Sequence, residues 1–155
     1  MSRCCGMPCR TGIRLVVLVF SLMFSPQVFA DGADLEFTVF GIDQQRGGII
    51  LAGLYSSDEA FPEAGGEMMG LEIPVDSSTL TARFADIPPG NYIIGLLHDE
   101  DGDFAMDFGF LGIPREGYGF SGPQVAPLFP PSFNTAAVHI GENEKGTVSI
   151  TVKYL

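Results

Sequence analysis

Alternation between polar and apolar residues is the feature that most limits how this chain can fold. Polar and apolar residues alternate without interruption over Thr147–Tyr154, and the same pattern occurs over Leu35–Val39 and Leu80–Phe84. A period of two is typical of a β-strand that turns one face to a core and the other to water. Ile49–Tyr55 and Tyr92–Leu97 are apolar throughout, which predicts central strands buried on both faces.

Turn signals separate these predicted strands. Gln44–Gly48, Pro88–Asn91 and Gly141–Gly146 contain the Pro, Gly and Asn residues that favour tight turns. Ala136–Ile140 is a further short strand candidate, and Asp58–Gly70 has room for one short turn of helix. No window of ten or more residues has the periodicity of an amphipathic helix with caps. We therefore predict an all-β fold, a single Greek-key β-sandwich of six to eight strands similar to transthyretin or immunoglobulin domains.

The first thirty residues differ from the remainder of the chain. Three arginines with no acidic residue among them precede the apolar run Leu15–Phe24, and Val28 and Ala30 occupy the −3 and −1 positions of a cleavage site. This arrangement predicts a signal peptide over residues 1–30 and a β-sandwich domain over residues 31–155. The apolar run is too short to span a bilayer, which disfavours the alternative of an uncleaved anchor. We expect an exported protein, in the periplasm or the extracellular medium.

The composition of the predicted mature domain excludes several kinds of function. All three cysteines lie in the leader, so the domain has no disulfide, thiol nucleophile or thiolate metal site. Five basic residues stand against nineteen acidic ones, a net charge of −14. Such a surface repels nucleic acid and anionic membranes, and it attracts cations. Acidity that serves solubility alone is the alternative.

An acidic stretch follows the second apolar strand and carries the clearest chemical signal. Asp99, Asp101 and Asp103 are spaced by two, and Asp107 follows four residues later. Calcium takes six to eight oxygen ligands, and a loop that folds around the ion can direct alternate carboxylates inward. We predict a calcium site formed by these four residues, with Glu116 as a possible further ligand. A solvated acidic turn with no ion is the alternative.

The acidic stretch resembles the start of an EF-hand loop but departs from it. Phe104 replaces the sixth-position glycine, Phe110 replaces the twelfth-position glutamate, and no flanking helices are evident. A calcium-binding loop on a β-sandwich fits the sequence better. The only two histidines of the chain, His98 and His139, are predicted to be surface or sheet-edge residues rather than ligands of a transition metal.

Almost forty residues rich in Gly, Pro, Asp and aromatics separate Leu97 from Ala136. Long loops of this kind are usually functional or disordered, and the aromatic content argues against disorder. Within this connection, Tyr118 and Phe120 can either cap the open end of the sandwich or form a stacking platform, and capping is our prediction. The neighbouring Arg115–Glu116 pair can anchor the loop by ion pairing.

Three segments, Ile87–Asp107, Leu111–Ser121 and Pro130–Ile140, together resemble a bacterial secreted family catalogued as domain of unknown function family 2141. The resemblance spans roughly residues 48–155. It implies export and a sandwich similar to transthyretin-like and carboxypeptidase-regulatory-like domains, with no established activity. Loops of that family commonly carry Asn where this chain has Asp101 and Asp103, and Gly where it has Phe104, so the chain adds charge and loses a flexible position.

No catalytic motif is complete in the sequence. The segment around Ser121 is not a nucleophile elbow, because Pro123 stands where that motif needs glycine. We therefore expect a non-catalytic binding or structural module that uses the calcium loop and contacts a protein or an extracellular polymer. One alternative is a small carboxylate-based hydrolase or carbohydrate-active protein that uses Asp or Glu with His98. A purely structural envelope protein without a ligand is another.

Overall fold

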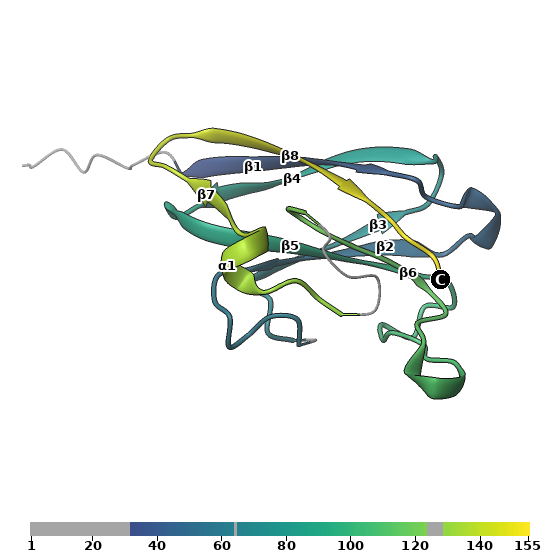
Figure 1. Ribbon diagram of the computed structural model, residues 1–155. Coiled ribbons are helices and arrows are strands. Elements are labelled where there is room, and N and C mark those ends of the chain that lie inside the picture. The colour runs from purple at the N-terminus through teal and green to yellow at the C-terminus, as the bar shows by residue number, and fades with distance from the viewer. Residues whose placement is uncertain (1–31, 64, 124–128) are drawn as a thin grey trace, which may run out of the picture.

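The computed structural model describes residues 32–63, 65–123 and 129–155, so the predicted signal peptide lies outside the described residues. Two sheets face each other as the layers of a sandwich (Figure 1). The described strands are β1 (Ala33–Phe40), β2 (Ile49–Tyr55), β3 (Met69–Pro74), β4 (Thr79–Ile87), β5 (Gly90–Asp99), β6 (Gly117–Phe120), β7 (Val138–Ile140) and β8 (Lys145–Thr151). The predicted all-β sandwich is confirmed.

The three-stranded sheet has the order β4-β1-β8 and behaves as its alternation predicts. β1 pairs antiparallel with β4 and parallel with β8, although β8 follows more than a hundred residues later. Leu35, Phe37 and Val39 are fully buried, and the Phe37 ring stacks on Phe84 with 5.4 Å between ring centroids. One face of this sheet therefore supplies a large share of the core.

The five-stranded sheet has the order β3-β2-β5, with β6 and β7 both paired to β5. β2 and β5 are central strands, as predicted. Only one face of β2 is fully buried, however: Ile50 and Leu54 lie in the core, whereas Leu51 and Gly53 are half-buried. The prediction of burial on both faces was wrong for β2, because no layer formed by the described residues covers the outer face of this sheet there.

Two strands were not predicted. In β3 apolar residues alternate with other residues over only six positions, which include one glutamate and one proline. β6 lies inside the long connection that was expected to be a loop throughout. Gly117 and Gly119 of β6 face β8 and the segment after it, where an added Cβ would collide with the Tyr154 ring at Gly117 and lie 2.9 Å from Ile150 at Gly119. This close approach turns Tyr118 and Phe120, the two aromatic residues of β6, to the outer face of the sheet. They do not cap the end of the sandwich, so the capping prediction was wrong.

Short helical elements join the strands. These are η1 (Gln44–Arg46), η2 (Phe110–Gly112) and α1 (Phe133–Ala136). The strand expected over Ala136–Ile140 begins only at Val138, because Ala136 ends α1. The described part of Asp58–Gly70 forms hydrogen-bonded turns before β3 starts, rather than a turn of helix.

Within residues 32–63, 65–123 and 129–155, no helix has the length and apolar character that a membrane span requires.

Candidate functional site

The end of β5 places His98 in the interior rather than at the surface, where it was predicted to lie. The ring is fully buried, and both of its nitrogens have partners. Nε2 donates to the Gly47 carbonyl at 2.6 Å, while Nδ1 lies 2.6 Å from the hydroxyl of Tyr154. That hydroxyl also accepts from the Asp43 backbone N–H, so it is free to donate to Nδ1, which assigns the neutral Nε2–H tautomer. Burial raises the pKa of Tyr154 and keeps this donor protonated.

Arg46 ties the first turn of the chain to the acidic loop. Its guanidinium donates to Glu100 at 2.6 Å and to Asp43 at 3.3 Å, and it lies 4.6 Å from the centre of the Tyr154 ring. The hydrogen bond that Arg46 donates to the Glu100 carboxylate raises the pKa of Arg46. Gly48 lies directly against the start of the acidic loop. Its φ is +73°, and an added Cβ would collide with the Asp99 carbonyl oxygen. Arg46 and Gly48 therefore both hold the turn before β2 against the first residues of the loop.

Asp99 is fully buried and organises the loop that follows it. Its Oδ1 accepts from the Gly102 N–H at 2.8 Å, and its Oδ2 accepts from the Phe104 N–H at 3.1 Å. The buried carboxylate thus accepts from two backbone donors of a loop that is otherwise exposed, and it fixes the turn between them.

Glu116 plays the same part from the other side of the loop. This carboxylate is also buried; Oε1 accepts from the Glu100 N–H at 2.9 Å and Oε2 from the Asp107 N–H at 3.1 Å. Among the described residues, no ion pair joins Glu116 to Arg115, so Glu116 anchors the loop through backbone groups rather than as predicted.

Asp101 and Asp103 are exposed and close successive turns. Asp101 accepts from the Asp103 N–H at 3.3 Å, and Asp103 accepts from the Ala105 N–H at 2.8 Å. Carboxylate oxygens of Asp99, Asp101 and Asp103 lie within 4.8 Å of one another. The structure therefore brings together three of the five predicted calcium ligands in an oxygen cluster. Asp107 and Glu116 are not part of that cluster.

Phe104 adopts the backbone conformation that a glycine would favour at its position. Its φ is +63°, and Gly102 has a φ of +80°. A residue with a Cβ pays roughly 1–2 kcal/mol for this left-handed conformation. Phe104 therefore holds a left-handed backbone conformation and carries a ring that is 55% exposed.

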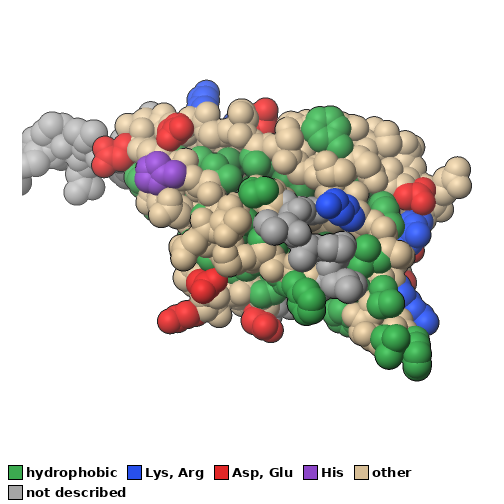
Figure 2. All heavy atoms as spheres, viewed as in Figure 1, with side chains coloured by type: hydrophobic (Ala, Val, Ile, Leu, Met, Phe, Trp, Pro, Cys, Tyr) green, Lys and Arg blue, Asp and Glu red, His purple; other side chains and the backbone are tan. Residues whose placement is uncertain are grey.

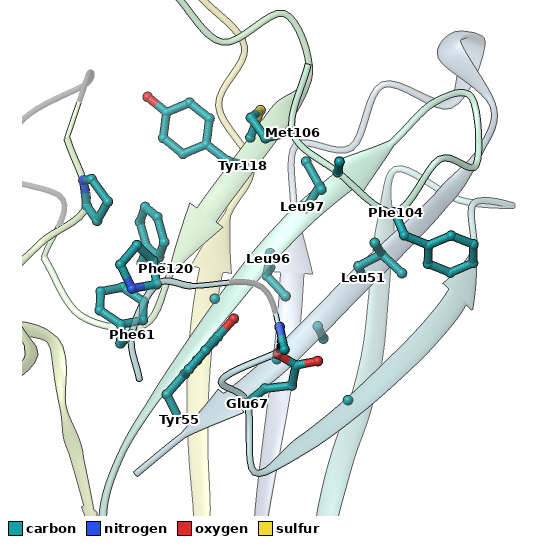
Figure 3. Close-up of a pocket in the computed structure, with 18 of the residues that line it drawn as sticks. Leu51, Tyr55, Phe61, Glu67, Leu96, Leu97, Phe104, Met106, Tyr118 and Phe120 are labelled. Atoms are coloured by element: carbon teal, nitrogen blue, oxygen red, sulfur yellow. Dashed lines mark hydrogen bonds between the residues drawn. The ribbon is translucent and has the colours of Figure 1, made fainter. Parts of the chain in front are cut away.

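An open groove of about 900 Å³ lies next to the acidic loop, on the outer face of the five-stranded sheet (Figure 3). Its floor is a row of glycines in register across three strands: Gly70 pairs with Gly53, and Gly53 pairs with Gly95. The next position in the row, on β6, is Phe120. Three neighbouring strands without side chains at one level leave the hollow.

Aromatic rings form one wall of the groove. Tyr55 and Phe61 pack edge to face with 5.3 Å between ring centroids, and Phe61 and Phe120 do so with 5.5 Å. The centroid of the Tyr118 ring lies 6.0 Å from that of Phe120. The Tyr118 hydroxyl is buried and has no hydrogen-bond partner among the described residues. Phe104 and Met106 of the acidic loop form part of the opposite rim, so the loop and the groove share a border.

A model of the family described as "Uncharacterized protein conserved in bacteria (DUF2141)" matches residues 37–149, most of the chain. The chain belongs to this family. The resemblance that the three sequence segments carry is thereby confirmed. No curated protein matches significantly, and neither does any solved structure.

The DUF2141 match covers both the acidic cluster and the glycine row, whereas Tyr154, which holds His98, lies beyond it. The acidic cluster was visible in the sequence because its residues are neighbours. The groove was not, because Gly53, Gly70 and Gly95 become one row only when the strand register is known.

An apolar tip projects between the acidic loop and β6. Phe110 is 85% exposed and Leu111 is 82% exposed, and both belong to η2. Figure 1 shows this green segment projecting away from the two sheets, and Figure 2 shows hydrophobic side chains gathered at the same corner. The tip is nevertheless well braced, since the Gly109 N–H donates to the Ile113 carbonyl at 2.7 Å and the Arg115 N–H to the Asp107 carbonyl at 2.9 Å.

Proposed function

We propose that this DUF2141 protein is an exported, non-catalytic binding module whose acidic loop binds calcium. The convergence of carboxylate oxygens from Asp99, Asp101 and Asp103 within 4.8 Å carries the proposal. Calcium prefers such oxygen ligands, in a loop whose backbone carbonyls and waters can complete the coordination. The partner contacted by the ordered loop is a protein or an extracellular polymer, and the exposed apolar tip is available for that contact.

The electrostatics of the cluster favour an ion over an empty loop. Three negative groups at this separation repel one another, and a divalent cation converts the repulsion into attraction. Asp101 and Asp103 each use one carboxylate oxygen for a backbone N–H, which leaves their second oxygens for a metal. Asp99 is held rigid by two backbone donors, so it contributes a preorganised ligand.

The geometry around His98 gives no support to the hydrolase alternative. A general base must reach the proton that it removes. Here the ring is fully buried, and both nitrogens are engaged by Gly47 and Tyr154. The His98 ring links β5 to the turn at Gly47 and to the C-terminal segment at Tyr154, which is a structural role.

Thermal unfolding in calcium and in chelator tests the proposal. A ligand at a hundred times its Kd stabilises the folded state by about 2.7 kcal/mol, so calcium should raise Tm by several degrees. The double variant Asp101→Asn/Asp103→Asn should lose this shift. The pair Asp76→Asn/Glu142→Gln removes the same charge at exposed positions outside the cluster and should keep it.

A single variant, Asp107→Asn, decides whether that residue joins the ligand set. Loss of the calcium shift would place Asp107 among the ligands, and an unchanged shift would remove it. If calcium changes neither Tm nor heat in calorimetry of the unaltered protein, the calcium proposal is overturned.

A further inference from the structure

We propose that the groove on the outer face of the five-stranded sheet binds a hydrophobic organic cation, a molecule with an apolar body and one positively charged group. This site is separate from the acidic cluster, and the proposal does not depend on calcium. It rests on the shape of the groove, its aromatic wall and the sign of the charges at its rim.

The floor of the groove is suited to a flat or extended apolar group. Gly53, Gly70 and Gly95 remove three side chains from the centre of the sheet. The Tyr55 ring lies over Gly53 and Gly95, so a ligand meets this ring there and can reach the backbone itself only at Gly70. Leu51 and Leu97 pair with each other one level along and continue the apolar floor. A volume of about 900 Å³ lies within the range of small-molecule sites in proteins.

The aromatic wall offers faces to a cation as well as area to an apolar group. Tyr55, Phe61 and Phe120 form a continuous chain of edge-to-face contacts along one side. A positive group within about 6 Å of such a ring is attracted by roughly 0.5–2 kcal/mol.

Every charged residue among the described lining residues is acidic. Glu67 and Glu72 border the groove, and no described lysine or arginine does. Figure 3 shows the Tyr55 hydroxyl directed toward Glu67, and the field of Glu67 adds to burial in raising the pKa of Tyr55. This rim repels fatty acids and other amphiphilic anions, and it complements a positive group at the β3 side of the groove.

Three amphiphiles with one chain and different head groups test the charge preference: decyltrimethylammonium, decyl maltoside and decyl sulfate. Calorimetry below the micelle concentration should show the cation binding about tenfold more tightly than the maltoside, and the sulfate most weakly. Equal affinities for the cation and the maltoside would overturn the proposed charge selectivity.

Two matched double variants separate local from overall charge. Glu67→Gln/Glu72→Gln should reduce the preference for the cation over the maltoside to the smaller one that the aromatic rings alone supply. Asp76→Asn/Glu142→Gln removes as much charge away from the groove lining and should leave the tenfold preference intact. A preference that is undiminished in the first pair, or disappears with the second, contradicts the proposal.

Filling the floor tests the location. At Gly70 an added Cβ meets only Glu67, at 3.9–4.0 Å, so Gly70→Val should fold with little change in Tm and lose binding of decyltrimethylammonium. At Gly95 an added Cβ meets Tyr55, Phe61 and Phe120 at ordinary contact distances of 3.4–3.8 Å, so Gly95→Ala should also fold, and it should bind more weakly. If both folded variants bind as tightly as the unaltered protein, the groove is not the site. Each titration is run in calcium and in chelator, so that failure of the ion site and failure of the groove are told apart.

Discussion

The two faces of the five-stranded sheet use the same strands for opposite purposes. On the inner face, Ile50, Leu54 and Ile94 are fully buried against the three-stranded sheet. On the outer face, one residue away along the same strands, Gly53 and Gly95 carry no side chain and form the floor of a groove. A strand can thus stabilise the fold with one face while the other is free to vary with function.

The glycine row is tolerated because of where it lies. Glycine weakens a strand, since it loses the most conformational freedom and offers no side chain to pack. β2 and β5 are hydrogen-bonded on both sides and have a buried inner face, which offset this cost. Gly70 lies in the edge strand β3, which pairs with β2 on one side only, so the cost is offset least there.

The largest expected effect contrasts the two faces of β5 directly. Ile94→Ala opens a cavity in the core and should lower the free energy of unfolding by about 2–5 kcal/mol. Leu97→Ala truncates a half-buried side chain that borders the groove and should cost less, about 1 kcal/mol. Chemical denaturation of the two variants measures the difference. Equal losses would mean that the outer face is as tightly packed as the inner one.

A smaller effect comes from the same contrast between buried and exposed groups within the acidic loop. Asp99→Ala removes a buried carboxylate that accepts two part-buried hydrogen bonds and should cost about 2–4 kcal/mol. Asp101→Ala affects an exposed turn and should cost less than about 1 kcal/mol. Both are compared in chelator by denaturant unfolding, which removes any contribution of calcium. A reversed order would show that the exposed turns, and not Asp99, hold the loop.

The smallest effect concerns the rim of the groove. Phe104→Gly relieves a left-handed φ but adds backbone entropy to the unfolded chain, so the free energy of unfolding should change by less than about 1 kcal/mol. Phe108 is similarly exposed, at 59%, but is not among the residues with positive φ. Phe108→Gly should therefore be the more destabilising of the two by about 1 kcal/mol, as measured by thermal and denaturant unfolding. The opposite order would show that the Phe104 ring itself stabilises the loop.

Much of the architecture was predictable from the sequence because it depends on neighbouring residues. Alternation identified β1, β4 and β8, and the apolar run over Ile49–Tyr55 coincides with β2. The spacing of Asp99, Asp101 and Asp103 brought out the acidic cluster, since a turning loop needs no distant contact to gather them. Local periodicity and local charge density are properties of a short segment, so they can be recognised without knowing which distant residues the segment contacts.

Tertiary structure alone decided the rest. The strand β6 was hidden in a glycine-rich segment, and its strand character becomes evident only where Gly117 and Gly119 face β8. His98 was predicted at the surface but is buried, because Gly47 and Tyr154, distant in sequence, satisfy both of its nitrogens. The groove likewise exists only through strand register, which long-range pairing sets and no local pattern encodes.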